Sequence, residues 1–270
     1  MLVAGIDIGS LATKAVIYDG ADGAIISSAC IPSGARPPQA GERVLQQVLE
    51  AADVDRDAIA VIVATGYGRE AISVADSTVT EITCAARGAH FYEPETRTVI
   101  DIGGQDSKAI RVDPRGYPLD FALNDRCAAG TGRFLEVMAG ALETSVDGLE
   151  RLALEAIAPV AIGRTCTVFA ESEIVGLLAS GVDRAAIAAG LCRSVALRTA
   201  GLARQVGVEP RVTLIGGVAL NRAIVRALSD VLAVEICVPA LPQLVVATGA
   251  ALVASDRADR HPSDLDRRCS

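Results

Sequence analysis

The sequence has no run of basic residues, no Cys-X-X-Cys pair and no unbroken apolar stretch of membrane-spanning length. Its 25 Lys and Arg residues are scattered among 33 Asp and Glu, which gives a net charge of -8. An acidic chain without a basic patch is poorly suited to bind nucleic acid or an anionic membrane. We therefore expect no nucleic acid and no membrane among its partners.

The segments that could direct the chain to a membrane or out of the cell are also lacking. The opening MLVAGIDIGS has the pattern of a strand, without the basic segment, apolar segment and cleavage site of a secretory signal. The most apolar region, residues 231–254, is interrupted by Glu235, Pro239, Pro242 and Gln243, so it cannot supply the ~20 consecutive apolar residues that a span needs. We expect a cytoplasmic protein.

What the chain does have is a large apolar fraction and a pattern that starts twice. Hydrophobic residues make up 51% of the 270 residues, enough for the cores of two lobes. In the first half, residues 2–8, 14–19 and 24–31 alternate like strands, residues 41–52 like a helix and residues 60–64 like a strand. We expect lobe I to span residues 1–95, with a closing helix at 243–256 packed on it.

The second half repeats this order. Strands are expected at residues 98–102, 107–113 and 118–123, a helix at 131–142, and a further strand with a glycine turn and a helix from residue 211. Lobe II would span residues 96–242, and residues 257–270 would form a flexible tail. Internal duplication predicts an α/β fold with two similar halves.

Both halves open with an apolar strand that ends in aspartate and is followed by glycine, in GIDIGS (residues 5–10) and DIGGQD (residues 101–106). Phosphates need closely approaching backbone N–H groups, which glycine permits, and their Mg²⁺ needs carboxylates or carboxylate-bound water. Asp7 and Asp101 would hold Mg²⁺ through water. The phosphate donors would be Gly9, Ser10, Gly103 and Gly104, together with Lys14. One such turn is equally typical of a hairpin, but two of them and IGGVA at residues 215–219 favour a nucleotide cleft.

Two of the seven cysteines precede segments with helical spacing: Cys127 in NDRCAAGTGRF and Cys166 in TCTVFAESE. Phe134, Leu135 and Met138 recur on one face after the first, and Val168, Ile174, Val175 and Leu178 after the second. Helix N-termini stabilise negative charge, and a symmetric dimer would turn two thiolates into the four that a [4Fe-4S] cluster needs. The two cysteines are therefore candidate cluster ligands. His90 and His261 offer no metal set.

The remaining cysteines have no such context. An odd number of cysteines in a protein expected in the cytoplasm argues against structural disulfides. Cys30, Cys84, Cys192 and Cys237 lie in apolar surroundings and are expected to be buried small hydrophobes. Cys269 belongs to the tail.

Six motifs occur together: GIDIGS, ATGYGR (64–69), DIGGQD, NDRCAAGTGRF (124–134), TCTVFAESE (165–173) and IGGVALN (215–221). Their order and spacing resemble the activators (archerases) of 2-hydroxyacyl-CoA dehydratases, a family of iron–sulfur ATPases that also includes ATPase components of benzoyl-CoA reductase. The resemblance covers residues 3–254. It implies a duplicated two-lobe fold of the actin, Hsp70 and sugar-kinase type (ribonuclease H-like), with a nucleotide cleft.

The resemblance also implies a function. Activators of this kind are homodimers that share one [4Fe-4S] cluster, bind ATP/ADP with Mg²⁺, and deliver one electron at low potential to a dehydratase or reductase component. The electron would come from ferredoxin or flavodoxin. Further residues implied at the nucleotide are Gly130, Gly132, Gly216, Gly217 and Ala219, and Gln105 is a candidate for positioning the attacking water. Leu220 departs from the polar residue expected there, which affects only the contacts to base or ribose.

Three alternatives stay open. Within the same family, the chain could be the ATPase component of a benzoyl-CoA reductase or the reductase of a double-cubane cluster protein. A small-molecule kinase on the same scaffold would need a catalytic carboxylate beside a substrate pocket and usually insertions to build it, which the chain does not have. An actin-like filament protein would need non-closing interfaces between copies. Brown colour and iron in protein purified without oxygen would distinguish the activator from the last two.

Overall fold

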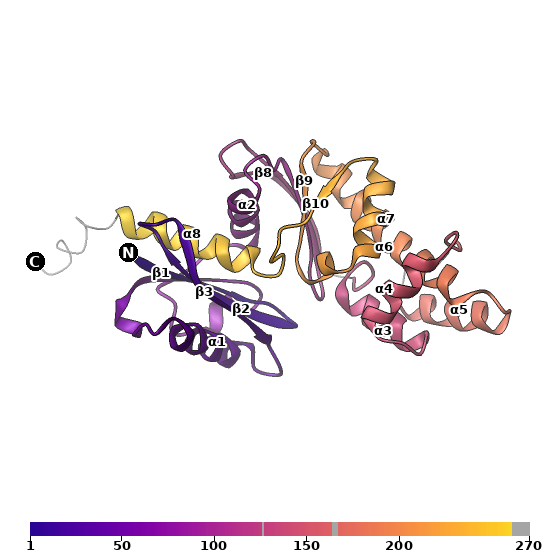
Figure 1. Cartoon of the computed structure of the whole chain (residues 1–270), viewed down its shortest axis with the longest axis horizontal. Helices are drawn as coiled ribbons and strands as arrows, with labels where there is room; N and C mark the ends of the chain where they lie inside the picture. The colour runs from indigo at the N-terminus through magenta and orange to yellow at the C-terminus, as the bar shows by residue number, and fades with distance from the viewer. Residues whose placement is uncertain (126, 164–166, 261–270) are drawn as a thin grey trace, which may run out of the picture. The chain divides into compact units, whose positions relative to one another are not determined.

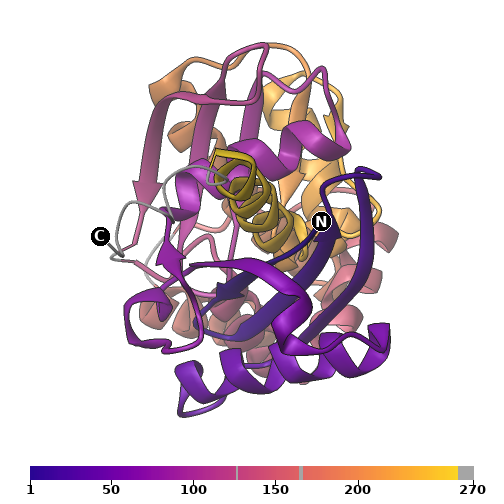
Figure 2. The same ribbon diagram turned by 90° about the vertical axis from the view of Figure 1, so that its left-hand side faces the viewer.

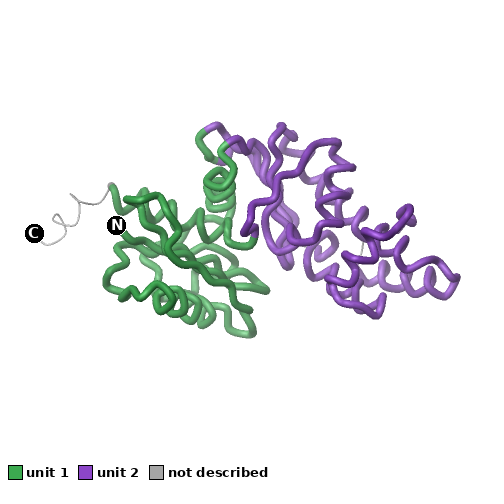
Figure 3. Tube along the Cα trace, in the orientation of Figure 1, with its two compact units in different colours: residues 1–94, 115–117, 243–270 green, residues 95–114, 118–242 purple. Residues whose placement is uncertain are grey.

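The computed structural model describes residues 1–125, 127–163 and 167–260. The chain divides into two compact units (Figure 3): unit 1 comprises residues 1–94, 115–117 and 243–270, and unit 2 comprises residues 95–114 and 118–242. Each unit contains a five-stranded sheet of mixed direction. The predicted duplication of an α/β half is therefore confirmed.

The sheet of unit 1 has the order β3-β2-β1-β4-β5. Its strands are β1 (Leu2–Ile8), β2 (Ala12–Asp19), β3 (Ala24–Pro32), β4 (Ile59–Thr65) and β5 (Ser77–Thr78), and the short 3₁₀ turns are η1 (Arg56–Ala58) and η2 (Arg69–Ala71). The first three strands pair antiparallel, and β1 pairs in parallel with β4. Asp7 thus lies opposite Lys14 on β2 and opposite Thr65 on β4.

Helices cover both faces of this sheet (Figures 1 and 2). Helix α1 (Pro37–Ala52) packs on β2 and β3, while α8 (Val245–Arg260) packs on β1, β4 and α2 (Glu81–Tyr92). Glycine makes the close approaches possible. A Cβ on Gly5 would lie 2.2 Å from the Ala247 carbonyl, and one on Gly249 would lie 1.8 Å from the Cys84 carbonyl. The α2–α8 crossing therefore requires a residue without a side chain.

Unit 2 repeats the strand order of unit 1 as β10-β9-β6-β7-β8. The strands are β6 (Thr98–Ile102), β7 (Ser107–Val112), β8 (Pro118–Asn124), β9 (Val212–Ile215) and β10 (Ile236–Cys237). The register repeats as well, because Asp101 lies opposite Lys108 as Asp7 lies opposite Lys14. The turn at residues 115–117 groups with unit 1, where the Arg87 guanidinium donates a 2.9 Å hydrogen bond to the Tyr117 hydroxyl.

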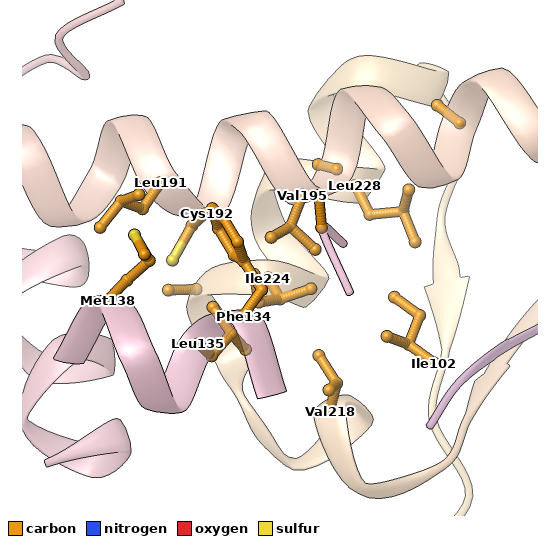
Figure 4. Packing of buried hydrophobic residues seen from close by; sticks show 14 of the residues in the cluster. Ile102, Phe134, Leu135, Met138, Leu191, Cys192, Val195, Val218, Ile224 and Leu228 are labelled. Atoms are coloured by element: carbon orange, nitrogen blue, oxygen red, sulfur yellow. The ribbon is translucent and has the colours of Figure 1, made fainter. Parts of the chain in front are cut away.

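The helices of unit 2 are α3 (Gly132–Ala141), α4 (Val146–Glu155), α5 (Thr167–Ala179), α6 (Arg184–Val206) and α7 (Arg222–Leu232), with the 3₁₀ turn η3 (Gly217–Leu220) before α7. Figure 4 shows their shared core, in which Phe134, Leu135 and Met138 of α3 meet Leu191, Cys192 and Val195 of α6. Helix α6 is long and apolar enough to cross a membrane, but 56% of its most apolar window is buried in the protein. Its composition is that of a core helix.

Two expectations about exposure and one about the tail were wrong. Val168 and Val175 of α5, expected to face the core, are 68% and 56% exposed, because only Ala170 and Ile174 of this helix are buried. Cys30 is exposed on the edge strand β3, whereas Cys84 and Cys192 are buried as expected and Cys237 is partly buried. Helix α8 continues to Arg260, so residues 257–260 of the expected tail are helical.

Candidate functional site

The first glycine loop joins β1 to β2 and carries an ion pair at its base. Lys14 Nζ lies 2.8 Å from Asp7 Oδ2, and both side chains are largely buried. The register of the hairpin places the two residues directly opposite each other on β1 and β2. A buried carboxylate of this kind pairs with the lysine ammonium group, and it can bind a hydrated cation when the lysine takes another partner.

The backbone of this loop is closed by hydrogen bonds. The Gly9 N–H donates to the Ala12 carbonyl at 3.1 Å, and the Ser33 hydroxyl donates to the Gly9 carbonyl at 2.6 Å. A Cβ on Gly9 would lie 2.7 Å from the Ala12 carbonyl oxygen and 3.3 Å from Lys14 Nζ. The loop therefore needs glycine at this position, and it brings Asp7, Gly9 and Lys14 together.

The second glycine loop joins β6 to β7 and repeats the geometry with one change. Lys108 Nζ lies 3.5 Å from Asp101 Oδ2 but only 2.6 Å from Asp106 Oδ2. The Gly103 N–H donates to the Asp106 carbonyl at 3.0 Å, the bond that Gly9 makes to Ala12 in unit 1. Asp106 thus stands where the first loop has Ala12, and it draws the lysine away from Asp101.

Lys108 was missed in the sequence analysis. Its side chain is only 8% exposed and lies between two carboxylates, which makes it as much a part of its loop as Lys14 is of the first. The signal was present in the sequence, since Lys108 follows Asp101 by the same interval as Lys14 follows Asp7. The antiparallel register of a hairpin with equal loops places both lysines opposite their aspartates.

Two other segments of unit 2 meet the second loop. The N–H groups of Gly132 and Arg133, at the start of α3, donate to the carbonyls of Gly103 and Gly104, each at 2.9 Å. A Cβ on Gly216 would lie 2.5 Å from Asp101 Oδ1, so the turn after β9 lies directly against this carboxylate. Within unit 2, the structure thus brings together five predicted site residues: Asp101, Gly103, Gly104, Gly132 and Gly216.

A hollow of about 530 Å³ adjoins the IGGVALN turn. It is formed by η3, α7 and the segment around β10, and its walls include Ala219, Leu220, Val225, Ile236 and Val238. Helix α7 starts at this point because the Asn221 side chain accepts a hydrogen bond from the Ile224 N–H at 3.0 Å. An apolar hollow with arginines at its rim (Arg222 and Arg226) can take a flat heteroaromatic ring.

Other predicted residues lie elsewhere or at the edge of these loops. Gln105 is exposed at the tip of the second loop, Ser10 is partly exposed in the first, and Gly217 is exposed at the start of η3. Gly130 is buried, packs against the Arg198 side chain and accepts a hydrogen bond from Ser107 through its carbonyl. Gly130 is therefore part of the loop that follows Cys127.

Cys127 is a free, partly exposed thiol, and the Asn124 side chain donates to its carbonyl at 2.9 Å. Helix α3 begins at Gly132, within a residue of the expected start at 131, and residues 128–131 lie between Cys127 and the helix. The first N–H groups of α3 bond the second glycine loop instead of the thiol. Cys166, the other predicted ligand, lies outside the described residues, where α5 follows from Thr167.

Among the residues that the structure describes, no three His, Cys, Asp or Glu side chains gather as a metal site. The donor chemistry still suits an iron–sulfur cluster, because two thiols per chain become four in a symmetric pair. On α5, Glu173 Oε1 accepts a 2.8 Å hydrogen bond from the Gly163 N–H, so this carboxylate holds Gly163 to helix α5. Glu171 is exposed to solvent.

Two further cysteines are unreactive at neutral pH. Burial raises the pKa of the Cys84 thiol from 9.0 to about 12, and burial likewise raises the pKa of Cys192 to about 12. A thiol with such a pKa has almost no thiolate at neutral pH, and the thiolate is the nucleophile and metal ligand. Cys84 and Cys192 therefore do not compete with Cys127 as ligands.

The duplicated units, the matching glycine loops and the glycine turn before α7 are those of the actin and sugar-kinase fold class. A ROK hexokinase from Thermus thermophilus has this fold, with a TM-score of 0.54 at 19% identity. Residues 4–254 match the model of the BadF/BadG/BcrA/BcrD ATPase family, and the chain belongs to this family.

The chain is similar over its length to proteins with assigned roles. It is 46% identical to the "Activator of lactoyl-CoA dehydratase" of Anaerotignum propionicum, over 96% of this chain and 100% of the relative. The crystal structure of the Acidaminococcus fermentans (R)-2-hydroxyglutaryl-CoA dehydratase component A superposes with a TM-score of 0.92 at 43% identity, covering 96% of this chain and 99% of that one. The activator of the 2-hydroxyisocaproyl-CoA dehydratase from Clostridium difficile, with bound ADPNP, gives 0.90 at 43% identity, covering 100% and 98%.

A component of the benzoyl-CoA reductase of Thauera aromatica is a more distant relative. It is 31% identical over 85% of this chain and 82% of its own length.

Proposed function

We propose that this protein is an ATP-dependent activator of a 2-hydroxyacyl-CoA dehydratase. The observation that carries the proposal is the pair of matching loops, Asp7 with Lys14 and Asp101 with Lys108, in a chain that aligns from end to end with relatives named as dehydratase activators. The loops support ATP binding and hydrolysis, and the similarity to these relatives supports activation of a dehydratase as the function.

Each unit contributes its own glycine loop with groups suited to a nucleotide and its metal. Asp7 and Asp101 hold Mg²⁺ through water, and Gly9, Ser10, Gly103, Gly104 and Gly132 offer backbone or hydroxyl donors to phosphate oxygens. Lys14 and Lys108 exchange their carboxylate partners for phosphate oxygens when the nucleotide arrives. Ala219 lines the 530 Å³ hollow, which takes the base, and Gly216 and Gly217 precede it in the same turn. Gln105, exposed at the loop tip, is the candidate for orienting the attacking water.

The cluster is held by Cys127 and Cys166 of two identical chains. When bound, it supplies a single electron at low potential. The partly exposed Cys127 and the exposed apolar side chains of α5, Val168, Phe169 and Val175, support a shared site between copies, because a helix that follows Cys166 directly in the sequence offers apolar surface that a dimer would cover. The homodimer is therefore part of the proposal.

Nucleotide binding changes the surroundings of the thiols. Within unit 2, the start of α3 is bonded to the phosphate loop through Gly132 and Arg133, so a shift of that loop moves the segment that follows Cys127. ATP favours the arrangement that opens the cluster to the dehydratase, and hydrolysis restores the other arrangement. The working partners are the dehydratase component as electron acceptor and a cytoplasmic ferredoxin or flavodoxin as donor.

A role as the ATPase component of a benzoyl-CoA reductase is the second candidate, favoured only by the lower similarity to the Thauera aromatica protein. The likeness to hexokinase concerns the fold alone. The experiment that tests the proposal is reconstitution of the purified protein with iron and sulfide under anaerobic conditions, followed by mixing with a purified 2-hydroxyacyl-CoA dehydratase and a strong reductant. Activation of the dehydratase with ATP and none with ADP supports the proposal; equal activity with and without the protein contradicts it.

A further inference from the structure

The first two residues of β7 hold two different loops. Ser107 donates a hydrogen bond through its hydroxyl to the Gly130 carbonyl at 2.9 Å, while Lys108 lies between Asp101 and Asp106 of the phosphate loop. Successive side chains of a strand point to opposite faces of the sheet. Ser107 therefore contacts the cysteine loop, residues 127–131, and the next residue, Lys108, contacts the phosphate loop.

The Ser107 contact is buried and spans a long interval of sequence. The side chain is 3% exposed, and its acceptor lies 23 positions along the chain. A buried side-chain to backbone hydrogen bond of this kind shifts a local equilibrium by roughly fivefold. Gly130 has a positive φ of 90°, a conformation that glycine adopts without steric cost, so its carbonyl can point at Ser107 without backbone strain.

Further hydrogen bonds hold the cysteine loop at its start and just beyond its end. The Asn124 side chain holds the Cys127 carbonyl, and the N–H groups of Gly132 and Arg133 hold the carbonyls of Gly103 and Gly104. Ser107 is thus the middle attachment of a loop whose far end already follows the phosphate loop. It is the attachment that connects the loop to the strand carrying Lys108.

The structure also provides room for this loop to shift. A hollow of about 390 Å³ borders it, with Ser107, Asn124, Gly130, Arg198 and Thr199 among its walls. Movement of the Gly130 carbonyl into this space breaks the Ser107 hydrogen bond, which is therefore one of the costs of moving the loop.

We propose that Ser107 is a positioning residue that couples the nucleotide state of the second phosphate loop to the position of Cys127. When Lys108 leaves Asp106 for a phosphate oxygen, the start of β7 shifts, and Ser107 transmits that shift to Gly130. The proposal rests on the proposed function, because it takes ATP to bind at Asp101.

The test uses the full chain without cluster, so that it does not depend on electron transfer. Alkylation of Cys127 by iodoacetamide is followed by mass spectrometry, with and without Mg²⁺ and ADPNP. In the wild-type protein ADPNP should change the alkylation rate. Ser107→Ala should raise the nucleotide-free rate about fivefold, the population shift expected for one lost hydrogen bond, and should remove the response to ADPNP.

Matched variants separate the hydroxyl from the shape of the side chain. Ser107→Thr and Ser107→Val differ only in the hydroxyl, and threonine already occupies the equivalent strand position, Thr13, in unit 1. Thr should behave as the wild type, and Val should behave as Ala. Thr98→Val is the control: it removes another buried hydroxyl, which bonds the Glu209 carbonyl at 3.0 Å in the same unit, and it should leave Cys127 alkylation unchanged.

Wild-type alkylation rates in both Ser107→Ala and Ser107→Val would overturn the proposal. It would also be overturned if calorimetry shows ADPNP bound to the wild-type protein while Cys127 alkylation stays the same. Neither result touches the assignment as an iron–sulfur ATPase, which fails separately if ADPNP does not bind or if iron reconstitution gives no cluster.

Discussion

Lys108 lies opposite Asp101 in an antiparallel hairpin, as Lys14 lies opposite Asp7. The carboxylate nearest to Lys108 is nevertheless that of Asp106, at 2.6 Å, whereas Asp101 is 3.5 Å away. The two loops share the Asp, Gly and Lys positions, and one of the differences between them is Asp106 in place of Ala12. Because Lys108 lies closer to Asp106, Asp101 is farther from its lysine, at 3.5 Å, than Asp7 is from Lys14, at 2.8 Å, and we expect Asp101 to be the main anchor for Mg²⁺.

The first prediction concerns these carboxylates. Asp101→Asn should lower Mg-ATP hydrolysis by at least about 100-fold, and Asp7→Asn should lower it by a smaller factor, since a positioned charge at the reacting phosphates is typically worth this much. Iron content after reconstitution should stay at the wild-type value in both. Phosphate release assays and iron analysis measure the two effects. Asp120→Asn, on the exposed part of β8, is the control, and unchanged hydrolysis in Asp7→Asn and Asp101→Asn would place the active site elsewhere.

A second prediction follows from Lys108. Lys108→Met should leave Asp101 and Asp106 without a shared counter-ion, so Mg²⁺ should bind more tightly in the absence of nucleotide while ATP hydrolysis falls. Magnesium titration by calorimetry and phosphate release provide the measurements. Lys108→Arg, which keeps the charge, should retain weak Mg²⁺ binding; if Met and Arg behave alike, the charge of Lys108 is not the cause.

The third prediction concerns the cluster ligands. Cys127→Ser or Cys166→Ser should remove iron from the reconstituted protein and weaken the dimer, because four thiolates must come from two chains. Cys30→Ser, at an exposed thiol of unit 1, and Cys269→Ser should do neither. Iron analysis and light scattering decide the matter, and full iron content in both ligand variants would exclude a cluster held by these cysteines.

A fourth prediction tests the packing of unit 1. Gly249→Ala should destabilise the protein by about 1–3 kcal/mol or more, because its Cβ would lie 1.8 Å from the Cys84 carbonyl and the helices must move apart. Gly201→Ala in α6 has no atom within 4 Å of the added Cβ and should stabilise by about 1 kcal/mol through helix propensity. Urea unfolding compares the two. Equal effects would mean that the α2–α8 contact is not close.

The fifth prediction is a loss of stability at alkaline pH, caused by the two buried thiols. Since burial raises the pKa of Cys84 and Cys192 from 9.0 to about 12, the unfolded chain releases these protons first as the pH rises. Stability is therefore unaffected by these groups below about pH 9 and falls above it, by up to about 1.4 kcal/mol per pH unit for each thiol until the folded pKa is reached. Urea unfolding between pH 8 and 10 should show the decline, and Cys192→Ala should reduce its slope.

Much of the fold was predictable from local pattern. Each opening hairpin was visible as two apolar strands around an Asp-X-Gly turn, and the helix after Gly130 was assigned within a residue of α3 (Gly132–Ala141). Helix α6 was not assigned, because residues around most of its circumference are buried and no one-sided period results. The same limit explains α5, where Val168 and Val175 repeat at helical spacing yet face away from the core.

The candidate site was predictable to a similar degree. Asp7, Gly9, Lys14, Asp101 and Gly103 could be proposed from motif chemistry alone. Lys108 could have been proposed from the interval to Asp101, which equals that from Asp7 to Lys14, but Ser107 could not, because its role depends on a loop that returns to β7 at Gly130. Whether an α3 N–H serves Cys127 or the phosphate loop is likewise a matter of tertiary contact, which the spacing of NDRCAAGTGRF does not contain.

The central claim is that ATP controls access to a cluster held by Cys127 and Cys166. The most direct measurement is the rate at which an added chelator removes iron from the anaerobically reconstituted protein in different nucleotide states. A ligand shifts a conformational equilibrium only through different affinity for the two states, so a nucleotide that opens the cluster must speed this reaction. The account predicts faster iron loss with Mg-ATP, or with ADP and a phosphate mimic, than without nucleotide, and no difference in Asp101→Asn. Identical rates in every nucleotide state of the wild-type protein would contradict it.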